Sequence, residues 1–452
     1  MNKKHIILLL LCLSLFLFSG CQKAPSSPQQ SSHDKTDHRT AADDDLANHG
    51  VLAILETENG YYYNYGYSVD EAGKNYMGSG MIVKHLLRYY DKATGETILL
   101  CSKPECEHLG DASCAATYKN LYVINTVIYE EQIYIYGLEK NEEILRLNLY
   151  RAALDGSSMD LVGTVFEAEN TIGDGFAIQA HKPLNICDES FIIHRGYAYL
   201  PYYLRLGTAS KGFMGGGLVQ MDLRTGKTKT IYEMENMNSY CPFNLRGCSD
   251  YVYIDFTGTS RYVISEDRLE HRFIEKSPNL DAVTEERLYT MRPTYDEETH
   301  KSSEPVIVSV YDSITGTPIP AESFETDLTC EEYARQLRTF SYDGMLITAT
   351  DKRVVFYDIE SENYGTKLGE IEINIDCENF RWYSHYYNKP ADIKITNGKL
   401  YLICNPTAYD GYMDPNAVRQ GSYLLYQVYS CPVEDILKGQ GTWEKAFEFQ
   451  PK

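Results

Sequence analysis

A repeated pair of strand patterns constrains the fold of this chain more than any other feature. One half of the repeat is an apolar strand, a polar two-residue turn and a second strand, as in residues 245–255. The other half is a strand that ends on a large hydrophobic residue and Asp, followed by a Thr-Gly turn and a last strand, as in residues 218–232. Together the halves make a four-stranded antiparallel meander, which cannot bury both faces alone and must stack on its neighbours. Four aspartates follow one another at intervals of 45, 45 and 46 residues, about the length of one such unit: Asp222, Asp267, Asp312 and Asp358.

The repeat predicts an all-β chain folded as a single β-propeller of four-stranded antiparallel blades. The 39 tyrosines favour strands, and the helix-like pieces are short, such as residues 330–338. The hairpin half recurs at residues 184–194, where the turn is expected at 188–189. We favour seven blades, with six as the alternative, because the fifth blade lacks a clear first strand and could merge with the fourth. The seven ranges are 51–101, 120–166, 182–235, 242–276, 284–325, 335–375 and 390–450.

A meander of this kind sorts its connections between two faces. The first-to-second and third-to-fourth turns lie on one face, here called the turn face, and we expect nearly all of them to be short. The second-to-third loops and the connections between blades lie on the opposite face, here called the loop face. Long loops commonly carry function, so we expect the binding surface on the loop face. The long segments assigned to it are residues 68–80, 102–120, 167–182, 205–216, 293–304, 374–389 and 405–422.

The N-terminus has the charged, apolar and small segments of a secretory signal peptide. Lys3 and Lys4 precede an apolar run over residues 6–18, which is too short for a stable transmembrane helix. The run from Phe18 to Cys21 resembles the bacterial lipobox, which implies cleavage after residue 20 and lipidation of Cys21 by acyl chains such as palmitate. The alternative is an ordinary signal peptide cut nearby.

Three segments follow from this interpretation. Residues 1–20 are the signal peptide, residues 21–50 are a polar tether that we expect to be disordered, and residues 51–452 form the propeller domain. The protein would then be lipid-anchored to the cell membrane on its extracytoplasmic face, at the cell surface.

The charge of the chain limits its partners. The sequence has 42 basic and 64 acidic residues, a net charge of −22. A basic footprint for nucleic acid is therefore absent, and we expect no nucleic-acid partner. We expect the protein to be a monomer.

A cysteine cluster follows the last strand of the first predicted blade. Cys101, Cys106, His108 and Cys114 lie within 14 residues, and three thiols with one imidazole suit tetrahedral zinc. The spacing between the first two cysteines is at the edge of the usual range. A disulfide is the competing interpretation, because disulfides form outside the cell, and free thiols are the third.

The run from Cys101 to His108, with Cys114, resembles a C-x-K-P-x-C-x-H…C loop of lipoproteins of the Firmicute type. Those lipoproteins also carry a lipobox and a Tyr-rich, TolB-like β-propeller domain of unknown function. The resemblance implies a propeller lipoprotein in a Gram-positive cell envelope, and it implies no activity.

Aromatic residues cluster in two segments assigned to the loop face. Partly buried aromatic rings stack on sugars or peptides, although these rings could instead pack the loops onto the blades. The candidate ligand-binding residues are Trp382, Tyr383, His385, Tyr386, Tyr387, Tyr409 and Tyr412.

Signals for catalysis are weak. The chain has no G-x-S-x-G or H-E-x-x-H motif, and residues 215–217 are expected to be a glycine hairpin loop without a phosphate-binding context. Residues 439–443 resemble the end of an Asp-box but lack its Ser-x-Asp start. The leading hypothesis is a non-enzymatic binding or scaffold propeller for an extracellular peptide, glycan or envelope protein. The alternative is an extracellular enzyme acting on carbohydrate or peptide, and a third hypothesis is a sensor or assembly partner.

Overall fold

The computed structural model describes residues 55–57, 59–69, 82–103, 121–140, 144–169, 176–179, 191–206, 213–235, 243–255, 258–274, 280–296, 301–375, 392–396, 398–404 and 427–448. The chain divides into two compact units, Met1–Arg39 and Thr40–Lys452, and every described residue belongs to the second. The predicted signal peptide, Cys21 and the tether lie outside the described residues. Within the described part of the chain, no helix is long and apolar enough to span a membrane.

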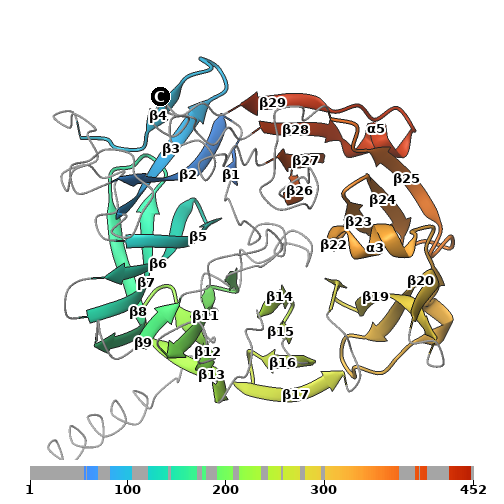
Figure 1. Ribbon diagram of the computed structural model, residues 1–452, viewed down its shortest axis with the longest axis horizontal. Coiled ribbons are helices and arrows are strands. Elements are labelled where there is room, and N and C mark those ends of the chain that lie inside the picture. The colour runs from blue at the N-terminus through green and yellow to red at the C-terminus, as the bar shows by residue number, and fades with distance from the viewer. Residues whose placement is uncertain are drawn as a thin grey trace, which may run out of the picture. The chain divides into compact units, whose positions relative to one another are not determined.

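The described strands form seven antiparallel sheets, which follow one another around a common centre in Figure 1. Each sheet pairs four strands in chain order, and the third adds a fifth, β9, alongside its second strand. The fold is therefore a seven-bladed β-propeller, as predicted. The six-blade alternative is wrong, because the fifth set of strands forms a sheet of its own whose first strand begins before residue 284 and is only Ala282–Val283.

The first three blades contain thirteen strands. Blade 1 is β1 (Leu55–Glu56), β2 (Gly60–Val69), β3 (Ile82–Asp91) and β4 (Thr97–Leu99). Blade 2 is β5 (Leu121–Tyr129), β6 (Gln132–Lys140), β7 (Ile144–Ala153) and β8 (Met159–Glu169). Blade 3 is β9 (Phe176–Gln179), β10 (Ile192–His194), β11 (Tyr197–Leu206), β12 (Phe213–Asp222) and β13 (Thr228–Glu235).

The described residues of the last four blades also form three short helices. Blade 4 is β14 (Asn244–Cys248), β15 (Tyr251–Asp255), β16 (Thr259–Val263) and β17 (Arg268–Ile274). Blade 5 is β18 (Ala282–Val283), β19 (Arg287–Asp296), β20 (Lys301–Asp312), η2 (Pro320–Glu322) and β21 (Phe324–Glu325). Blade 6 follows α3 (Cys330–Ala334) with β22 (Gln336–Tyr342), β23 (Met345–Thr350), β24 (Arg353–Asp358) and β25 (Lys367–Glu372). Blade 7 is β26 (Asp392–Thr396), β27 (Lys399–Cys404), β28 (Gln427–Pro432), α5 (Val433–Leu437) and β29 (Glu444–Glu448).

Short turns join the first and second strands because their residues accept positive φ. Arg195 and Gly196 have φ of 52° and 77°, and Asp343 and Gly344 have φ of 46° and 69°. Two successive residues with positive φ make the type I′ turn, which matches the twist of the paired strands. The hairpins formed by the first two paired strands of blades 3 and 6 are therefore tight.

The hydrophobe-Asp and Thr-Gly pattern forms the turn between the third and fourth strands. In blade 3 the Asp222 carboxylate accepts the main-chain N–H groups of Arg224 and Thr225, both at 2.9 Å. Asp91 and Asp312 make the same pair of bonds. Asp267 differs, because it lies at the left-handed end of its turn with φ of 53° rather than at the end of the strand. Asp267 lies 45 residues from both Asp222 and Asp312, but it does not occupy the equivalent position in its blade.

The glycine of this turn packs against the preceding blade. Gly226 has φ of 69°, and a Cβ built on it would lie 2.1 Å from the carbonyl oxygen of Val162 in β8. Gly316 likewise leaves only 2.4 Å to the carbonyl oxygen of Phe273, which lies in β17, the fourth strand of blade 4. The Thr-Gly turn therefore lets the outer edges of neighbouring blades close.

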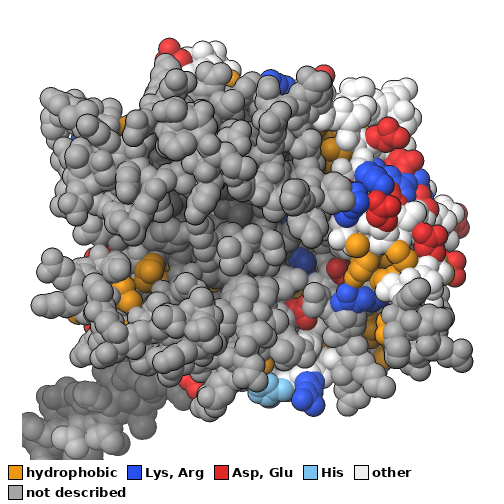
Figure 2. Space-filling view, viewed as in Figure 1, with side chains coloured by type: hydrophobic (Ala, Val, Ile, Leu, Met, Phe, Trp, Pro, Cys, Tyr) orange, Lys and Arg blue, Asp and Glu red, His pale blue; other side chains and the backbone are white. Residues whose placement is uncertain are grey.

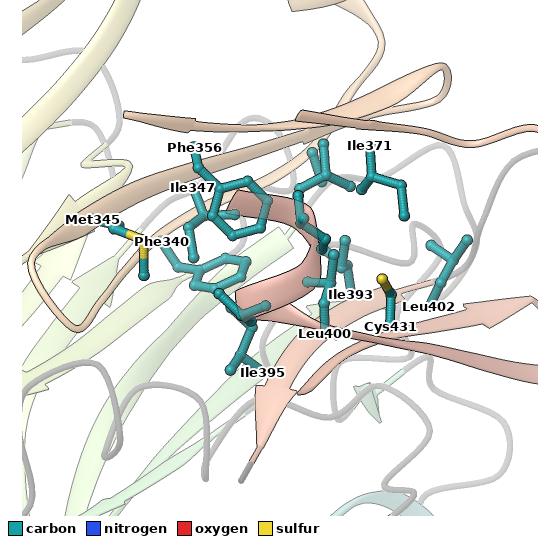
Figure 3. Packing of buried hydrophobic residues seen from close by; sticks show 14 of the residues in the cluster. Phe340, Met345, Ile347, Phe356, Ile371, Ile393, Ile395, Leu400, Leu402 and Cys431 are labelled. Atoms are coloured by element: carbon teal, nitrogen blue, oxygen red, sulfur yellow. The ribbon is translucent and has the colours of Figure 1, made fainter. Parts of the chain in front are cut away.

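The hydrophobic core is divided among the junctions between blades. Each of six adjoining pairs, from blades 1 and 2 to blades 6 and 7, has its own cluster of buried residues. Figure 3 shows the cluster of blades 6 and 7, where Phe340 and Phe356 of blade 6 pack with Ile393 and Leu400 of blade 7. Full burial of one such side chain contributes about 1.5–3 kcal/mol. Stacking of neighbours thus supplies the core that a single blade lacks.

Two local predictions for strands and helices are wrong. Residues 191–194 were expected to be the second strand of blade 3, but β10 is its innermost strand and pairs with β11 across the Arg195-Gly196 turn. Residues 330–338 do not form one helix, because α3 ends at Ala334 and β22 begins at Gln336. In blade 3 the left-handed turn at Arg195 and Gly196 overrides the local pattern. After Ala334 the pairing of β22 with β23 does so.

The sorting of connections by face is only partly as predicted. Three third-to-fourth connections are longer than expected: residues 313–323 with η2, 359–366, and 433–443 with α5. The described parts of segments 205–216 and 293–304 are strand, and residues 215–217 lie within β12 rather than in a loop. A Cβ on Gly217 would lie 2.7 Å from the ring of Tyr202, so this glycine makes room for a tyrosine on the paired strand.

Candidate functional site

Most residues predicted to form the site lie outside the described residues. This holds for all seven aromatic and histidine candidates, and for three members of the cysteine cluster: Trp382, Tyr383, His385, Tyr386, Tyr387, Tyr409, Tyr412, Cys106, His108 and Cys114. The zinc and disulfide interpretations both stay predictions. No group of three or more potential metal-ligating side chains occurs among the described residues.

The first residue of the cysteine cluster is described. Cys101 is partly buried and follows blade 1. A Cβ on Gly156, in the turn between β7 and β8, would lie 3.0 Å from the Cys101 nitrogen, and Ser102 Oγ donates to the Gly156 carbonyl oxygen at 3.4 Å. The main chain at the start of the cluster is therefore held against blade 2.

A polar cluster occupies the loop-face ends of blades 4, 5 and 6. We call it the central polar cluster and define it as Arg246, Asp255, Asp281, Arg292, Tyr333 and Gln336. Asp255 ends the second strand of blade 4, and Asp281 and Gln336 stand at the start of the innermost strands of blades 5 and 6. Those strand ends lie on the face where the blade connections arrive, so the chain path brings these groups to the loop face.

Main-chain N–H groups hold both carboxyl groups of the cluster. Leu280 N–H donates to Asp255 Oδ2 at 2.7 Å, and Thr259 Oγ1 donates to Oδ1 at 3.3 Å. Met291 N–H donates to Asp281 Oδ2 at 2.6 Å, and Gln336 Nε2 lies 3.5 Å from Oδ1. The two side chains therefore join blades 4, 5 and 6 to one another.

Burial changes the acidity of these carboxyl groups. It raises the pKa of Asp281 to about 6, against the opposing effects of the Met291 N–H and of the nearby Arg292 and Arg246 charges. Burial also raises the pKa of Asp255, again with both arginines opposing. A carboxyl that titrates near pH 6 can exchange a proton close to neutral pH.

The two arginines balance the charge of the cluster. Arg246 is 4% exposed, and its Nε donates to the Leu280 carbonyl oxygen at 3.4 Å. Arg292 Nη1 donates to the Tyr333 hydroxyl at 2.5 Å, whereas its buried Nε has no hydrogen-bond partner among the described residues. With two guanidinium groups beside two carboxyl groups, the cluster suits a ligand oxygen better than a metal cation.

Sequence reasoning missed the central polar cluster. Its one visible signal is a charged residue inside an apolar strand, as at Arg246 and Arg292. Because the chain is rich in carboxylates, no pattern singled out Asp255 or Asp281. Their proximity depends on the packing of three blades, which single-strand patterns do not contain.

Comparisons with known proteins find only weak similarity. No protein-family model and no curated protein matches the chain. The β-propeller domain of the Trilobed protease from Pyrococcus furiosus is similar over 88% of this chain and 95% of that chain, at 10% identity with a TM-score of 0.38. Acylaminoacyl peptidase from Pyrococcus horikoshii is similar over 86% of this chain but only 59% of its own, at 10% identity with a TM-score of 0.42.

Values this low say nothing of function. The class of the protein, a seven-bladed β-propeller, rests on the strand pairing of the chain itself.

Proposed function

We propose that this chain is an exported, lipid-anchored propeller that binds a peptide, glycan or envelope protein without catalysing a reaction. Its anchor is Cys21, its location is the extracytoplasmic face of the cell membrane, and its ligand meets the loop face. The lipobox-like N-terminus and the aromatic residues assigned to the loop face motivate the proposal. The fold adds a frame on which such loops are displayed.

The bracing of the central polar cluster carries the non-enzymatic part of the proposal. Asp255 and Asp281 each accept a short main-chain hydrogen bond and face two arginines. Groups used in this way lock the blades together and make this part of the loop face rigid. A rigid frame that carries variable loops is the usual design of a binding protein.

A glycan and peptide array probed with the full chain tests the binding function. We expect a ligand whose signal falls at least about tenfold in the Tyr386→Ala, Tyr387→Ala double variant, because aromatic contacts dominate such interfaces. Ile314→Ala is the control, since Ile314 is a 64% exposed hydrophobic residue in a third-to-fourth connection, which lies on the turn face. An array without any signal, or equal loss in the control, would contradict the proposal.

The anchor is tested separately by expression in a Gram-positive bacterium grown with labelled palmitate. We expect label on the wild-type chain and its recovery in the membrane fraction, because two or more acyl chains give stable anchoring. Cys21→Ala should carry no label. Equal labelling of both chains would show that Cys21 is not the lipidation site.

One observation favours the enzymatic alternative. Asp281, with a pKa of about 6, has the acidity of a general acid or base, and it lies beside Arg292. A hydrolytic activity on carbohydrate or peptide that Asp281→Asn abolishes would replace the binding proposal. Turnover that survives this substitution would not involve the cluster.

A further inference from the structure

An open groove of about 550 Å³ lies at the outer junction of blades 6 and 7. We call it the Trp443 groove, and define it by Glu372, Asn374, Tyr429, Gly439, Thr442 and Trp443. Of these six residues, only Asn374 lies in a segment that the sequence assigned to the loop face, residues 374–389. A second hollow of about 490 Å³ adjoins it, because Glu370, Glu372 and Asn374 line both.

The indole of Trp443 is fixed in the groove. Its Nε1–H donates to the carbonyl oxygen of Glu372, the last residue of β25, at 2.9 Å. The ring is partly exposed and packs against the buried cluster of blades 6 and 7, as does Tyr429. Two aromatic side chains therefore line an open site, and one of them is held in a single orientation.

Polar side chains that do not hold the described structure together line the groove beside these two rings. Glu372, Asn374 and Thr442 are exposed, and their side chains make no hydrogen bond or ion pair with other described residues. They offer a carboxylate, an amide and a hydroxyl, which between them can both donate and accept. Gly439 adds no side chain, and a Cβ there would meet nothing within 4 Å, so the main chain is accessible at this point.

The charge of the groove is small. Glu370 lies between Arg353 Nη1 at 2.6 Å and Lys367 Nζ at 2.9 Å, so its charge is balanced. Figure 2 shows basic and acidic side chains interleaved over α3 and blade 6. Glu372 alone leaves an unbalanced charge within the Trp443 groove. A strongly cationic or anionic ligand therefore has little to gain from it.

We propose that the Trp443 groove binds a neutral carbohydrate chain, with one sugar ring against the indole and its hydroxyl groups bonded to Glu372 and Asn374. A sugar ring has an apolar face for the aromatic ring and neighbouring hydroxyls for a carboxylate or an amide. The open shape suits a few residues of a longer chain. A net charge of −22 disfavours acidic polysaccharides.

The two tryptophans of the chain allow a direct test. In the Trp382→Phe variant, Trp443 is the only tryptophan, so its fluorescence reports the groove. We titrate this full-length variant in detergent with maltohexaose, cellohexaose, mannohexaose and xylohexaose. At least one of these sugars should give a saturable change in the Trp443 fluorescence at sugar concentrations up to about 10 mM. This range includes weak, millimolar binding.

Added substitutions test the contacts in the same background. Glu372→Gln and Asn374→Ala should each weaken binding about five- to tenfold, the effect of losing one or two hydrogen bonds. Glu362→Gln, an exposed glutamate on the turn between β24 and β25, is the matched control and should leave binding unchanged. Both groove residues are exposed, so their substitution should not disturb folding.

Three outcomes would overturn the inference: no saturable change with any neutral sugar, equal weakening by Glu362→Gln, or binding of hexalysine or hexagalacturonate alone. The converse variant, Trp443→Phe, leaves Trp382 as the reporter for the loop residues. If Trp382 responds in the Trp443→Phe variant but Trp443 does not respond in the Trp382→Phe variant, the result would support the proposed function and contradict this inference. The opposite pattern would support this inference, and the array then decides on the proposed function.

Discussion

The outer edge is closed in different ways at the junction of blades 2 and 3 and at that of blades 6 and 7. Between blades 2 and 3, the turn at Gly226 lies so close to Val162 that a Cβ would fall 2.1 Å from its carbonyl oxygen. Between blades 6 and 7, α5 lengthens the corresponding turn, and Trp443 bonds to Glu372 across a groove. At these two junctions, the short Thr-Gly turn seals the outer edge, whereas the turn lengthened by α5 leaves room for a ligand.

The interiors of the two junctions are alike. Both are apolar clusters built from the inner strands, with Leu147, Phe191 and Leu200 at 0% exposure in one and Phe340, Phe356 and Leu400 at 0% in the other. The difference is therefore confined to the outer edge. The propeller can change one edge without changing its core.

Substitution of the sealing glycine should have the largest effect. Gly226→Ala forces a side chain into the main chain of blade 2 and into a left-handed conformation. Together these should lower the free energy of unfolding by about 3 kcal/mol. The midpoint of urea unfolding, followed by circular dichroism, measures the change.

Gly439→Ala is the matched control at the open junction. Gly439 has a φ of 70°, almost the same as Gly226 at 69°, but no atom lies within 4 Å of its Cβ position. We expect a loss of about 1 kcal/mol, from the backbone conformation alone. Equal losses at the two glycines would mean that close approach does not seal the junction between blades 2 and 3.

The repeat in the sequence predicted the fold well because its signals are local. Tight hairpins and the hydrophobe-Asp and Thr-Gly turn depend on a few neighbouring residues. This pattern placed the inner hairpin of blade 4 at residues 245–255 and left the first strand of the fifth blade open. The inner hairpin of blade 3 was misassigned because an Asp-Glu pair was taken for the turn that Arg195 and Gly196 make. An arginine with positive φ is uncommon, so composition does not reveal it.

The site was much harder to predict. Trp443 stood out only as part of a motif fragment, and its bond to Glu372 spans 71 residues of sequence. The central polar cluster likewise brings Asp255 and Asp281 together from two blades. Such groups become neighbours only after the blades stack, which no strand pattern specifies.

Removal of the indole should have the next largest effect and should affect only the open junction. Trp443→Ala deletes the bond to Glu372 and partly buried packing, so we expect a loss of about 2.5 kcal/mol. Trp443→Phe keeps most of the packing and should lose about 1 kcal/mol. Urea midpoints of both variants measure this, and equal losses would show that the hydrogen bond, not the ring, holds this edge.

The stability contributed at Asp281, before the first strand of blade 5, should respond to mildly acidic pH. Asp281 has a pKa of about 6 in the folded protein, against 3.8 for an ordinary Asp. Between these values the folded state binds more protons, so its stability falls as the pH rises from about 4 to about 6. The Asp281→Asn variant should lack this fall, which we expect to be roughly 2 kcal/mol. Unfolding in urea at several pH values compares the two, and identical profiles would contradict the assignment.

The outer junction of blades 5 and 6 should respond to pH in the opposite direction, and most weakly. Asp327 accepts from Tyr357 Oη at 2.7 Å and from Lys367 Nζ at 2.8 Å. Although burial opposes it, these bonds and the charge of Arg353 lower the pKa of Asp327 to about 2. Its contribution is thus present above pH 4 and is lost as the pH falls from about 4 to about 2.

Because Asp327 is 42% exposed, solvent screening reduces this contribution to about 1 kcal/mol. Asp327→Asn should therefore lower stability at pH 6 and leave it unchanged at pH 2, as read from urea midpoints. Asp91→Asn is the control. The pKa of Asp91 is also lowered, but by hydrogen bonds from Thr94 and Ala93 within its turn and not by ion pairs. If 1 M salt abolishes the effect of Asp327→Asn, as screening of exposed charges predicts, the junction is held by ion pairs; persistence in salt would assign it to the Tyr357 hydrogen bond instead.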